Sequence, residues 1–338
     1  MAERVQVSAG GDYFPGRNNK RFFSTGCTVL DCVLGGGWCL GRVANIVGDK
    51  SVGKTLLAIE AVANFANLFP TGKIWYRESE AAFDTFYAQS LGLPIDRVDF
   101  GPEGEDSLWQ TIEDIYEDIR ECIKFSIEND VPGLYIIDSL DAVGARAGVG
   151  RDLDQGSFRL DKQKLLSEMF CEIAGELKKA HIAVIIISQV RDKIGFVVGE
   201  KHTRSGGKDL DFYASHIIWL SHLKRIVKTI GGVKRAIGVR IKANCKKNKV
   251  TVPFGECEFA IRFGYGVDDL VASLDWLEEV KHLGDIDLTP AMVDRFIAES
   301  DGLSTQDYRK LVRDVSLAVI NAWEEVEGRF KPTRKKYG

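Results

Sequence analysis

The feature that most constrains this chain is a glycine loop with the sequence Gly48-Asp49-Lys50-Ser51-Val52-Gly53-Lys54-Thr55. An apolar run at residues 43–47 precedes the loop and a helix-like segment at 56–62 follows it, so the loop connects a strand to a helix. In that setting backbone N–H groups turn toward phosphate oxygens, and the helix N-terminus adds partial positive charge. We expect Lys54 to reach the outer phosphates of a nucleoside triphosphate and Thr55 to ligate Mg²⁺. A chance match is the alternative, and the strand and helix context weakens it.

The composition is that of a chain able to bury a full core. It has 338 residues, 45% hydrophobic and 28% charged, which suggests about two or three folded units. We expect a cytoplasmic protein, because no segment reads as a signal peptide or a membrane span. The seven cysteines include no Cys-x-x-Cys pair and fit no zinc spacing, which favours reduced thiols.

Three further buried-type strands follow the glycine loop, at 73–77, 134–138 and 182–187, and each ends in polar residues. Carboxylates at such ends point into the crevice where α/β sheets bind ligands. Either Glu78 or Glu80 is expected to orient a water aimed at the terminal phosphate, with a plain surface loop as the alternative. Asp138 is expected to hold the hydration shell of Mg²⁺. Gln189 is placed to sense the terminal phosphate.

The predicted fold is α/β, a mainly parallel twisted sheet flanked by helices and extended by antiparallel strands. A hairpin is expected at 225–230 and 234–243, joined through Gly231-Gly232, and a last strand at 258–263. The predicted organisation is a flexible arm over 1–23 with Phe22 and Phe23 able to dock on a neighbour, a core over 24–270, a small helical C-terminal domain over 271–328, and a basic tail over 329–338.

Positive charge is concentrated in one block. The net charge is −4, yet residues 191–249 hold fifteen Lys/Arg against four Asp/Glu. This block indicates a polyanionic partner, and a solvated basic face is the alternative. Glycine-rich or basic loops are predicted at 144–159 and 191–207, and an apolar insert at Phe196 suits a nucleic-acid strand. The basic tail either touches nucleic acid or is merely solvated.

Several motifs together identify a family resemblance. They are Ser24-Thr25-Gly26, the glycine loop, Glu80-Ala81-Ala82-Phe83-Asp84 with Tyr87, Ile137-Asp138-Ser139, Ser188-Gln189-Val190-Arg191-Asp192-Lys193-Ile194-Gly195, Gly206-Gly207, Phe212-Tyr213-Ala214-Ser215, and Lys247-Asn248-Lys249 before Pro253-Phe254. With them, residues 24–268, roughly three quarters of the chain, resemble the ATPase core of the RecA/RadA recombinases, nearest the bacterial and phage RecA branch.

The resemblance implies a role for each motif. The catalytic set would be Lys54, Thr55, Glu80 rather than Glu78, Asp138 and Gln189. ATP would lie on the glycine loop with Asp84 and Tyr87 at adenine, and Mg²⁺ would bind Thr55 directly and Asp138 through water. A neighbouring subunit would supply Lys247 and Lys249 to the phosphates and close Phe263 and Gly264 over the adenine. Phe212 would lie at the subunit interface.

The resemblance also implies DNA contacts, because the segments 150–159 and 191–204 correspond to the two loops of the family's DNA channel. The residues concerned are Arg151, Arg159, Arg191, Lys193, Phe196, Lys201, Arg204, Gly206 and Gly207. The implied function is a DNA-dependent ATPase that assembles on single-stranded DNA and promotes pairing and strand exchange with homologous duplex DNA. Self-association into a helical filament or ring is implied, with no membrane partner, in the nucleoid of a bacterial or virus-infected cell.

The chain departs from the family in three places. The arm 1–23 does not resemble the N-terminal helix and strand through which bacterial members add subunits, Asp211 stands where a lysine is usual, and the C-terminal segment matches nothing in the family. One alternative function is therefore a ring helicase or single-strand annealing helper, although such rings more often supply an arginine than the Lys247-x-Lys249 pair. Another is a DNA-binding regulator that does not hydrolyse ATP.

Overall fold

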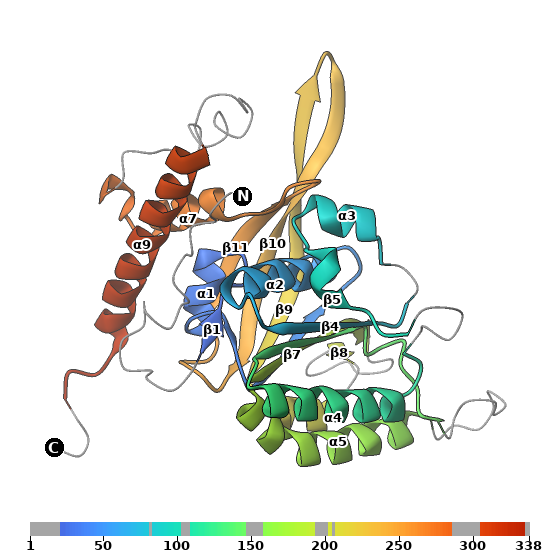
Figure 1. Cartoon of the computed structure of the whole chain (residues 1–338). Helices are drawn as coiled ribbons and strands as arrows, with labels where there is room; N and C mark the ends of the chain where they lie inside the picture. Colours follow the sequence, from blue (N-terminus) through green and yellow to red (C-terminus); the bar gives the residue numbers. More distant parts are fainter. Residues whose placement is uncertain are drawn as a thin grey trace.

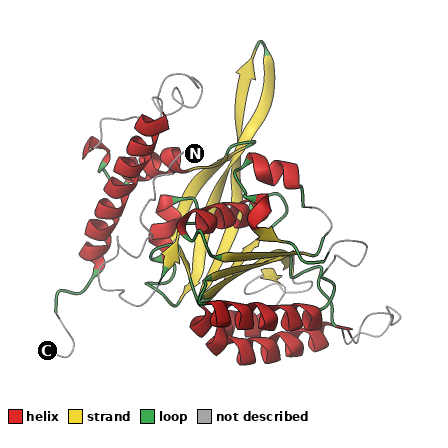
Figure 2. Cartoon of the chain, viewed as in Figure 1, coloured by secondary structure: helices red, strands yellow, loops and turns green. Residues whose placement is uncertain are grey.

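The computed structural model describes residues 21–80, 83–102, 109–146, 158–192, 202–204, 207–285 and 305–334. Its centre is a ten-stranded sheet, drawn in Figures 1 and 2. In spatial order the parallel strands are β5 (Val98–Asp99), β4 (Lys73–Glu78), β6 (Gly133–Asp138), β7 (Ile182–Asp192), β3 (Val43–Gly48) and β9 (His216–Ile230). The α/β prediction is confirmed, with the short strand β5 added at one edge.

The central strands are apolar along their whole length because helices cover both faces of the sheet. One face packs against α2 (Lys54–Leu68), and the other packs against α4 (Ile112–Asn129) and α5 (Phe158–Ala180). Successive residues alternate between the two hydrophobic cores, with Ile46 on the α2 side and Val47 on the α4/α5 side. The apolar spacing of residues 103–130 predicts an amphipathic helix, and helix α4 begins at Ile112 with a capping box formed by Thr111 and Asp114.

Antiparallel strands extend the sheet beyond β9. They are β10 (Val233–Asn248), β11 (Glu256–Arg262) and β12 (Gly266–Asp268). The hairpin forms at the expected Gly231-Gly232 turn, where both residues have positive φ, of 56° and 80°. Its strands run longer than predicted, and the far end projects from the body in Figure 1.

The expected N-terminal arm ends earlier than residue 23. Phe22 and Phe23 form strand β1 (Phe22–Phe23), pair with β2 (Trp38–Cys39), and are buried in their own chain at 0% and 1% exposure. The expectation that these two rings dock on a neighbour is therefore wrong. Gly37 makes the pairing possible, because at φ 91° a Cβ there would lie 2.3 Å from the carbonyl oxygen of Phe23.

The C-terminal helices pack on the core. Helices α7 (Asp269–Glu279) and α9 (Thr305–Phe330) contact each other and α1 (Thr28–Leu34), and Val319 of α9 is fully buried in the main core. The hydroxyl of Thr28 donates to Asp269 over 2.8 Å and lies 3.1 Å from Ser316 Oγ. The expected boundary between residues 270 and 271 falls inside α7, which a turn of 3₁₀ helix at Leu283–Asp285 follows. The sequence pair Thr289-Pro290 predicts the start of a further helix, and it lies outside the described residues.

Among the helices that the structure describes, none is long and apolar enough to cross a membrane.

Candidate nucleotide-binding site

The glycine loop lies at the carboxyl edge of the parallel strands. Strand β3 ends at Gly48, which is in register with Gln189 of β7 and Leu220 of β9. Gly53 is the N-cap of α2 at φ 87°, and a Cβ there would lie 2.3 Å from the Ile261 side chain. No side chain caps α2, so its first N–H groups are available to an anion. This cradle fits a nucleotide phosphate.

Lys54 lies folded over this loop. Its ammonium group donates to the carbonyl oxygen of Asp49 over 2.7 Å. Burial lowers the pKa of Lys54, and the nearby carboxylates of Asp138, Glu80 and Asp49 oppose that effect. An ammonium group held on the loop's own carbonyl has a short path to a bound phosphate.

Asp138 receives two hydroxyl groups on one oxygen. Thr55 Oγ1 donates to Asp138 Oδ2 over 2.9 Å, and Tyr76 Oη donates to the same oxygen over 2.7 Å. Burial raises the pKa of Asp138; the two hydroxyl groups work against that shift, whereas Glu80 and Glu78 add to it. A hydroxyl beside a carboxylate is a donor set of hard oxygens and fits Mg²⁺.

Glu80 is the centre of a second set of contacts. Ser139 donates its hydroxyl to Glu80 Oε1, and Gln189 Nε2 donates to the same oxygen over 3.1 Å. The backbone N–H of Gln189 donates to Asp141 Oδ2 over 2.6 Å. This hydrogen bond anchors the backbone from which the Gln189 side chain extends. Glu78 instead accepts the backbone N–H of Glu80 over 2.9 Å. The contact with Gln189 favours Glu80 over Glu78 for the catalytic carboxylate.

The five residues expected to be catalytic therefore gather at one edge of the sheet. Sequence reasoning did not assign roles to Tyr76, Ser139 or Asp141, which hold them in place. Ser139 directly follows Asp138 in the sequence, so its position could have indicated that it lies in the site. Nothing in the sequence around Asp141 indicated its contact with Gln189.

The expected adenine contacts lie on α3 (Thr85–Ser90). Asp84 is its N-cap and accepts the backbone N–H of Tyr87 over 2.9 Å. Tyr87 is 40% exposed. The aspartate thus serves the helix start, and the aromatic ring remains open to a planar ligand.

Lys247 and Lys249 lie at the end of β10, against α6 (Gly207–Tyr213). The ammonium group of Lys247 donates to the carbonyl oxygens of Asp211 and Phe212, and that of Lys249 donates to Phe212. Lys249 is exposed and Lys247 is half-buried, so neither is sequestered inside its own chain. Phe212 and Phe263, the residues expected at the subunit interface and over the adenine, are 69% and 56% exposed.

The expected DNA-binding residues fall on and around the two loops. Arg159 lies in α5, Arg191 in β7, Arg204 in β8 (His202–Arg204), and Gly207 begins α6. Strand β8 pairs antiparallel with β7, with Val190 opposite Arg204. The paired stem of the second loop thus begins one residue after Gln189. The remaining expected residues lie outside the described part: Arg151, Lys193, Phe196, Lys201 and Gly206.

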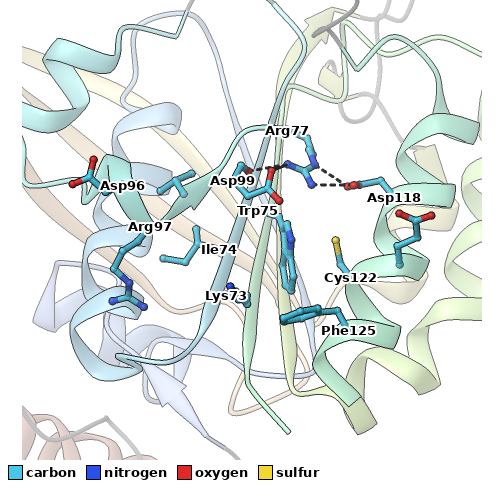
Figure 3. A pocket seen from close by; sticks show the side chains of 12 residues that line it. Lys73, Ile74, Trp75, Arg77, Asp96, Arg97, Asp99, Asp118, Cys122 and Phe125 are labelled. Carbon is cyan, nitrogen blue, oxygen red and sulfur yellow. Dashed lines mark hydrogen bonds and ion pairs between the residues drawn. The ribbon is translucent and has the colours of Figure 1, made fainter. Parts of the chain in front are cut away.

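A groove of about 480 Å³ lies away from this site, between the β4–β5 edge and α4, and Trp75, Arg97 and Phe125 are among its lining residues (Figure 3). A 3₁₀ turn at Ile95–Arg97 leads into β5 beside it.

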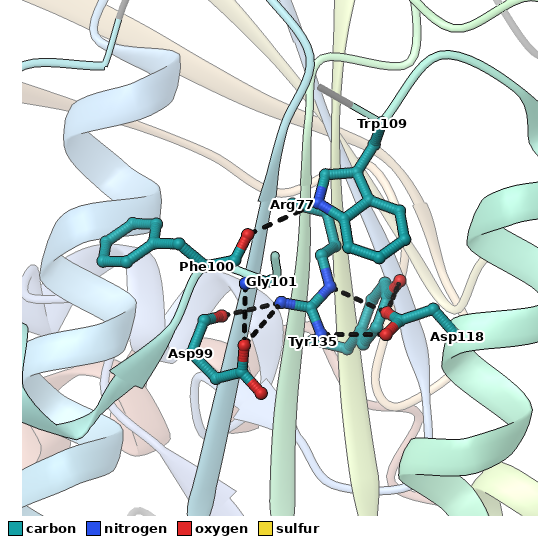
Figure 4. A network of polar contacts seen from close by, with 7 residues as sticks. All are labelled: Arg77, Asp99, Phe100, Gly101, Trp109, Asp118 and Tyr135. Atoms are coloured by element: carbon teal, nitrogen blue, oxygen red, sulfur yellow. Dashed lines mark hydrogen bonds and ion pairs between the residues drawn. The ribbon is translucent and has the colours of Figure 1, made fainter. Parts of the chain in front are cut away.

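Arg77 and Asp118 also line that groove. Arg77 is only 2% exposed and donates two hydrogen bonds to Asp118, of 2.7 and 2.9 Å (Figure 4). It also reaches Asp99 and lies 4.7 Å from the Trp109 ring. The sequence pattern predicts Arg77 only as the last residue of the buried-type strand at 73–77.

Comparison with known proteins gives a consistent result. A family model described as the RecA N-terminal domain matches residues 15–268. The chain is similar to Protein RecA of Synechocystis sp., with 32% identity over 76% of this chain and 68% of the relative. It is similar to Protein RecA of Nostoc sp., with 34% identity over 76% of this chain and 67% of the relative.

The matched region ends with β12 and leaves α7 and α9 outside it. A third relative, Protein RecA of Synechococcus sp., is 33% identical over 76% of this chain and 64% of its own length. The family model covers the glycine loop, the carboxylates around it and the central sheet, and the chain therefore belongs to the RecA family.

Proposed function

We propose that this protein is a DNA-dependent ATPase that assembles on single-stranded DNA and promotes homologous pairing and strand exchange. One observation carries the proposal. Gln189 contacts the Glu80 carboxylate over 3.1 Å, and the stem of the second basic loop begins at the next residue. The group that senses the nucleotide and the loop that meets DNA are thus adjacent on one strand.

The residues have distinct roles in hydrolysis. The start of α2 and Lys54 bind the phosphates, and Thr55 and Asp138 hold the metal. Glu80 orients and deprotonates the attacking water. Mg²⁺, when bound, neutralises charge on the phosphate oxygens. Ser139 and Gln189 hold the Glu80 carboxylate, so a movement of Gln189 changes the position of the base.

Two subunits complete each site in this proposal. Lys247 and Lys249 leave the carbonyls of α6 and reach the phosphates on the glycine loop of a neighbour. Cations delivered across an interface make the nucleotide stabilise the assembly, and hydrolysis weakens it. In the isolated chain, the carbonyl oxygens at the C-terminal end of α6 bind these two ammonium groups until a neighbour is present.

The partners are polyanions. Single-stranded DNA lies along the basic loops, and a homologous duplex pairs with it, with specificity set by base pairing between strands. The protein acts with DNA in the cytoplasm, on the nucleoid of a bacterial or virus-infected cell. A ring helicase is the second candidate, and the lysine pair in place of an arginine disfavours it.

The test compares ATP hydrolysis with and without single-stranded DNA, followed by strand exchange between that strand and a homologous duplex. We expect DNA to raise the rate, and Glu80→Gln to lower it by at least about 100-fold while ATP still binds. Electron micrographs with a slowly hydrolysed ATP analogue should show helical filaments. Closed rings that unwind duplex without strand invasion would favour the helicase, and a rate unchanged by DNA would contradict both.

A further inference from the structure

The Tyr76 hydroxyl is the least expected part of the nucleotide site. Tyr76 lies on β4 between Trp75 and Arg77 and is 0% exposed. Its hydroxyl donates to Asp138 Oδ2 over 2.7 Å. We propose that Tyr76 is a positioning residue that holds the Asp138 carboxylate for the metal ion, an inference that rests on the proposed function.

The two donors to Asp138 are not equivalent. Thr55 and Tyr76 reach the same oxygen from α2 and β4, whereas Asp138 ends β6. The Thr55 hydroxyl is expected to ligate Mg²⁺ as well, so it serves two partners. A phenol has a single donor hydrogen, and that of Tyr76 is already on the carboxylate. Tyr76 therefore fixes the carboxylate whether or not the metal is bound.

Packing fixes the direction of the hydroxyl. The Tyr76 ring lies 4.8 Å from the Phe83 ring and 5.8 Å from the Phe100 ring, and these two rings are 5.4 Å apart. A side chain locked by its neighbours holds a metal ligand in place before the metal arrives. Phe83 also directly precedes Asp84, so one aromatic cluster joins the metal side of the site to the adenine side.

The chain contains a matched control for a purely structural role. Tyr135 lies on β6, is also 0% exposed, and donates its hydroxyl to Asp118 Oδ2 over 2.6 Å. Asp118 pairs with Arg77 and has no part in the nucleotide site. Tyr76→Phe and Tyr135→Phe therefore remove the same group from the same kind of aspartate partner.

The experiment titrates a fluorescent ATP analogue onto the full chain, first in EDTA and then at rising Mg²⁺. We expect Tyr76→Phe to bind the analogue as the parent does in EDTA, but to need about tenfold more Mg²⁺ for half of the metal-dependent gain in affinity. Tyr135→Phe should match the parent in this titration. High Mg²⁺ should rescue ATP hydrolysis by Tyr76→Phe.

Equal Mg²⁺ requirements in the two variants would overturn the inference and leave the proposed function intact. If Tyr76→Phe does not fold, Phe83→Leu keeps the hydroxyl and loosens the ring, and it should raise the requirement by about threefold; a parental value would overturn the inference. A parent protein whose ATP binding does not depend on Mg²⁺ would overturn the proposed function together with it.

Discussion

The side-chain amide of Gln189 donates to Glu80 Oε1 over 3.1 Å, and Gln189 in turn is anchored through its backbone N–H to Asp141. The amide thus contacts the proposed base while its strand continues into the stem of the second basic loop.

Removing this amide should uncouple DNA from hydrolysis. Gln189→Ala leaves Glu80 with Ser139 but without a contact to β7. We expect the ratio of ATPase rates with and without single-stranded DNA to fall by about tenfold or more. Asn129→Ala, which removes an exposed amide at the end of α4, should keep the parental ratio. An unchanged ratio in Gln189→Ala would remove Gln189 from the coupling.

Two inactive variants should restore activity when mixed. Lys54→Ala disables the glycine loop of its own subunit, and Lys247→Ala disables only the group offered to a neighbour. In a random assembly, a site is intact only where the glycine loop of a Lys247→Ala subunit meets the lysine of a Lys54→Ala subunit. About a quarter of the sites have this pairing, so an equimolar mixture should recover about a quarter of the parental ATPase rate. Each variant alone should stay inactive. No recovery on mixing, with both variants folded, would place the lysine within its own subunit's site.

Arg77 should be needed for stability. Its removal leaves the carboxylates of Asp118 and Asp99 without the cation that donates to both of them. We expect Arg77→Met to lower the free energy of unfolding in urea by about 3–5 kcal/mol. Arg146→Met breaks an exposed pairing with Asp114 and Glu117 and should lower the free energy of unfolding far less than Arg77→Met does. Equal losses in the two variants would contradict the role assigned to burial.

Glu60 should make the stability depend on pH. Burial raises the pKa of Glu60 from 4.5 to about 7, partly offset by the Val267 N–H that donates to Oε1 over 3.1 Å. A raised carboxyl pKa means that ionisation is unfavourable in the folded state, so stability falls as pH rises from about 4.5 through 7. Glu60→Gln keeps an oxygen acceptor and removes this loss.

We expect Glu60→Gln to be about as stable as the parent near pH 4.5 and more stable above pH 7 by roughly 1–3 kcal/mol. Thermal unfolding from pH 4.5 to 8.5 measures the difference, and Glu128→Gln on the exposed side of α4 is the control. If the stabilities of Glu60→Gln and the parent change with pH in the same way, ionisation of Glu60 does not destabilise the folded state.

The strands that bear the site were predictable because each carries a local signal. The buried-type segments at 43–47, 73–77, 134–138 and 182–187 all form parallel strands, and the polar residues at the ends of the last three mark the carboxyl edge. The family then follows from motifs at fixed spacing. Comparison with known proteins confirms that assignment.

Contacts between residues distant in sequence were not predictable. Arg77 and Asp118 are 41 positions apart, and the burial of Arg77 depends on a helix that brings its partner. Tyr76 looked like an ordinary core residue because its hydroxyl partner is 62 positions away. Phe22 and Phe23 looked like an exposed arm because the two-residue strand that covers them, β2, is too short to give a pattern.

The outer half of the β9–β10 hairpin has a practical consequence. Strand β10 packs closely on β11 at Gly238, where a Cβ would lie 2.3 Å from the Ile261 carbonyl oxygen. Beyond it, residues 227–236 are exposed and turn at Gly231-Gly232. Because side chains alternate with a period of two, residues inserted or deleted in matched pairs keep every inner side chain on its own face. The tip of the hairpin is therefore a suitable insertion site, where a fluorophore or an affinity tag can be added with little effect on the stability of the fold.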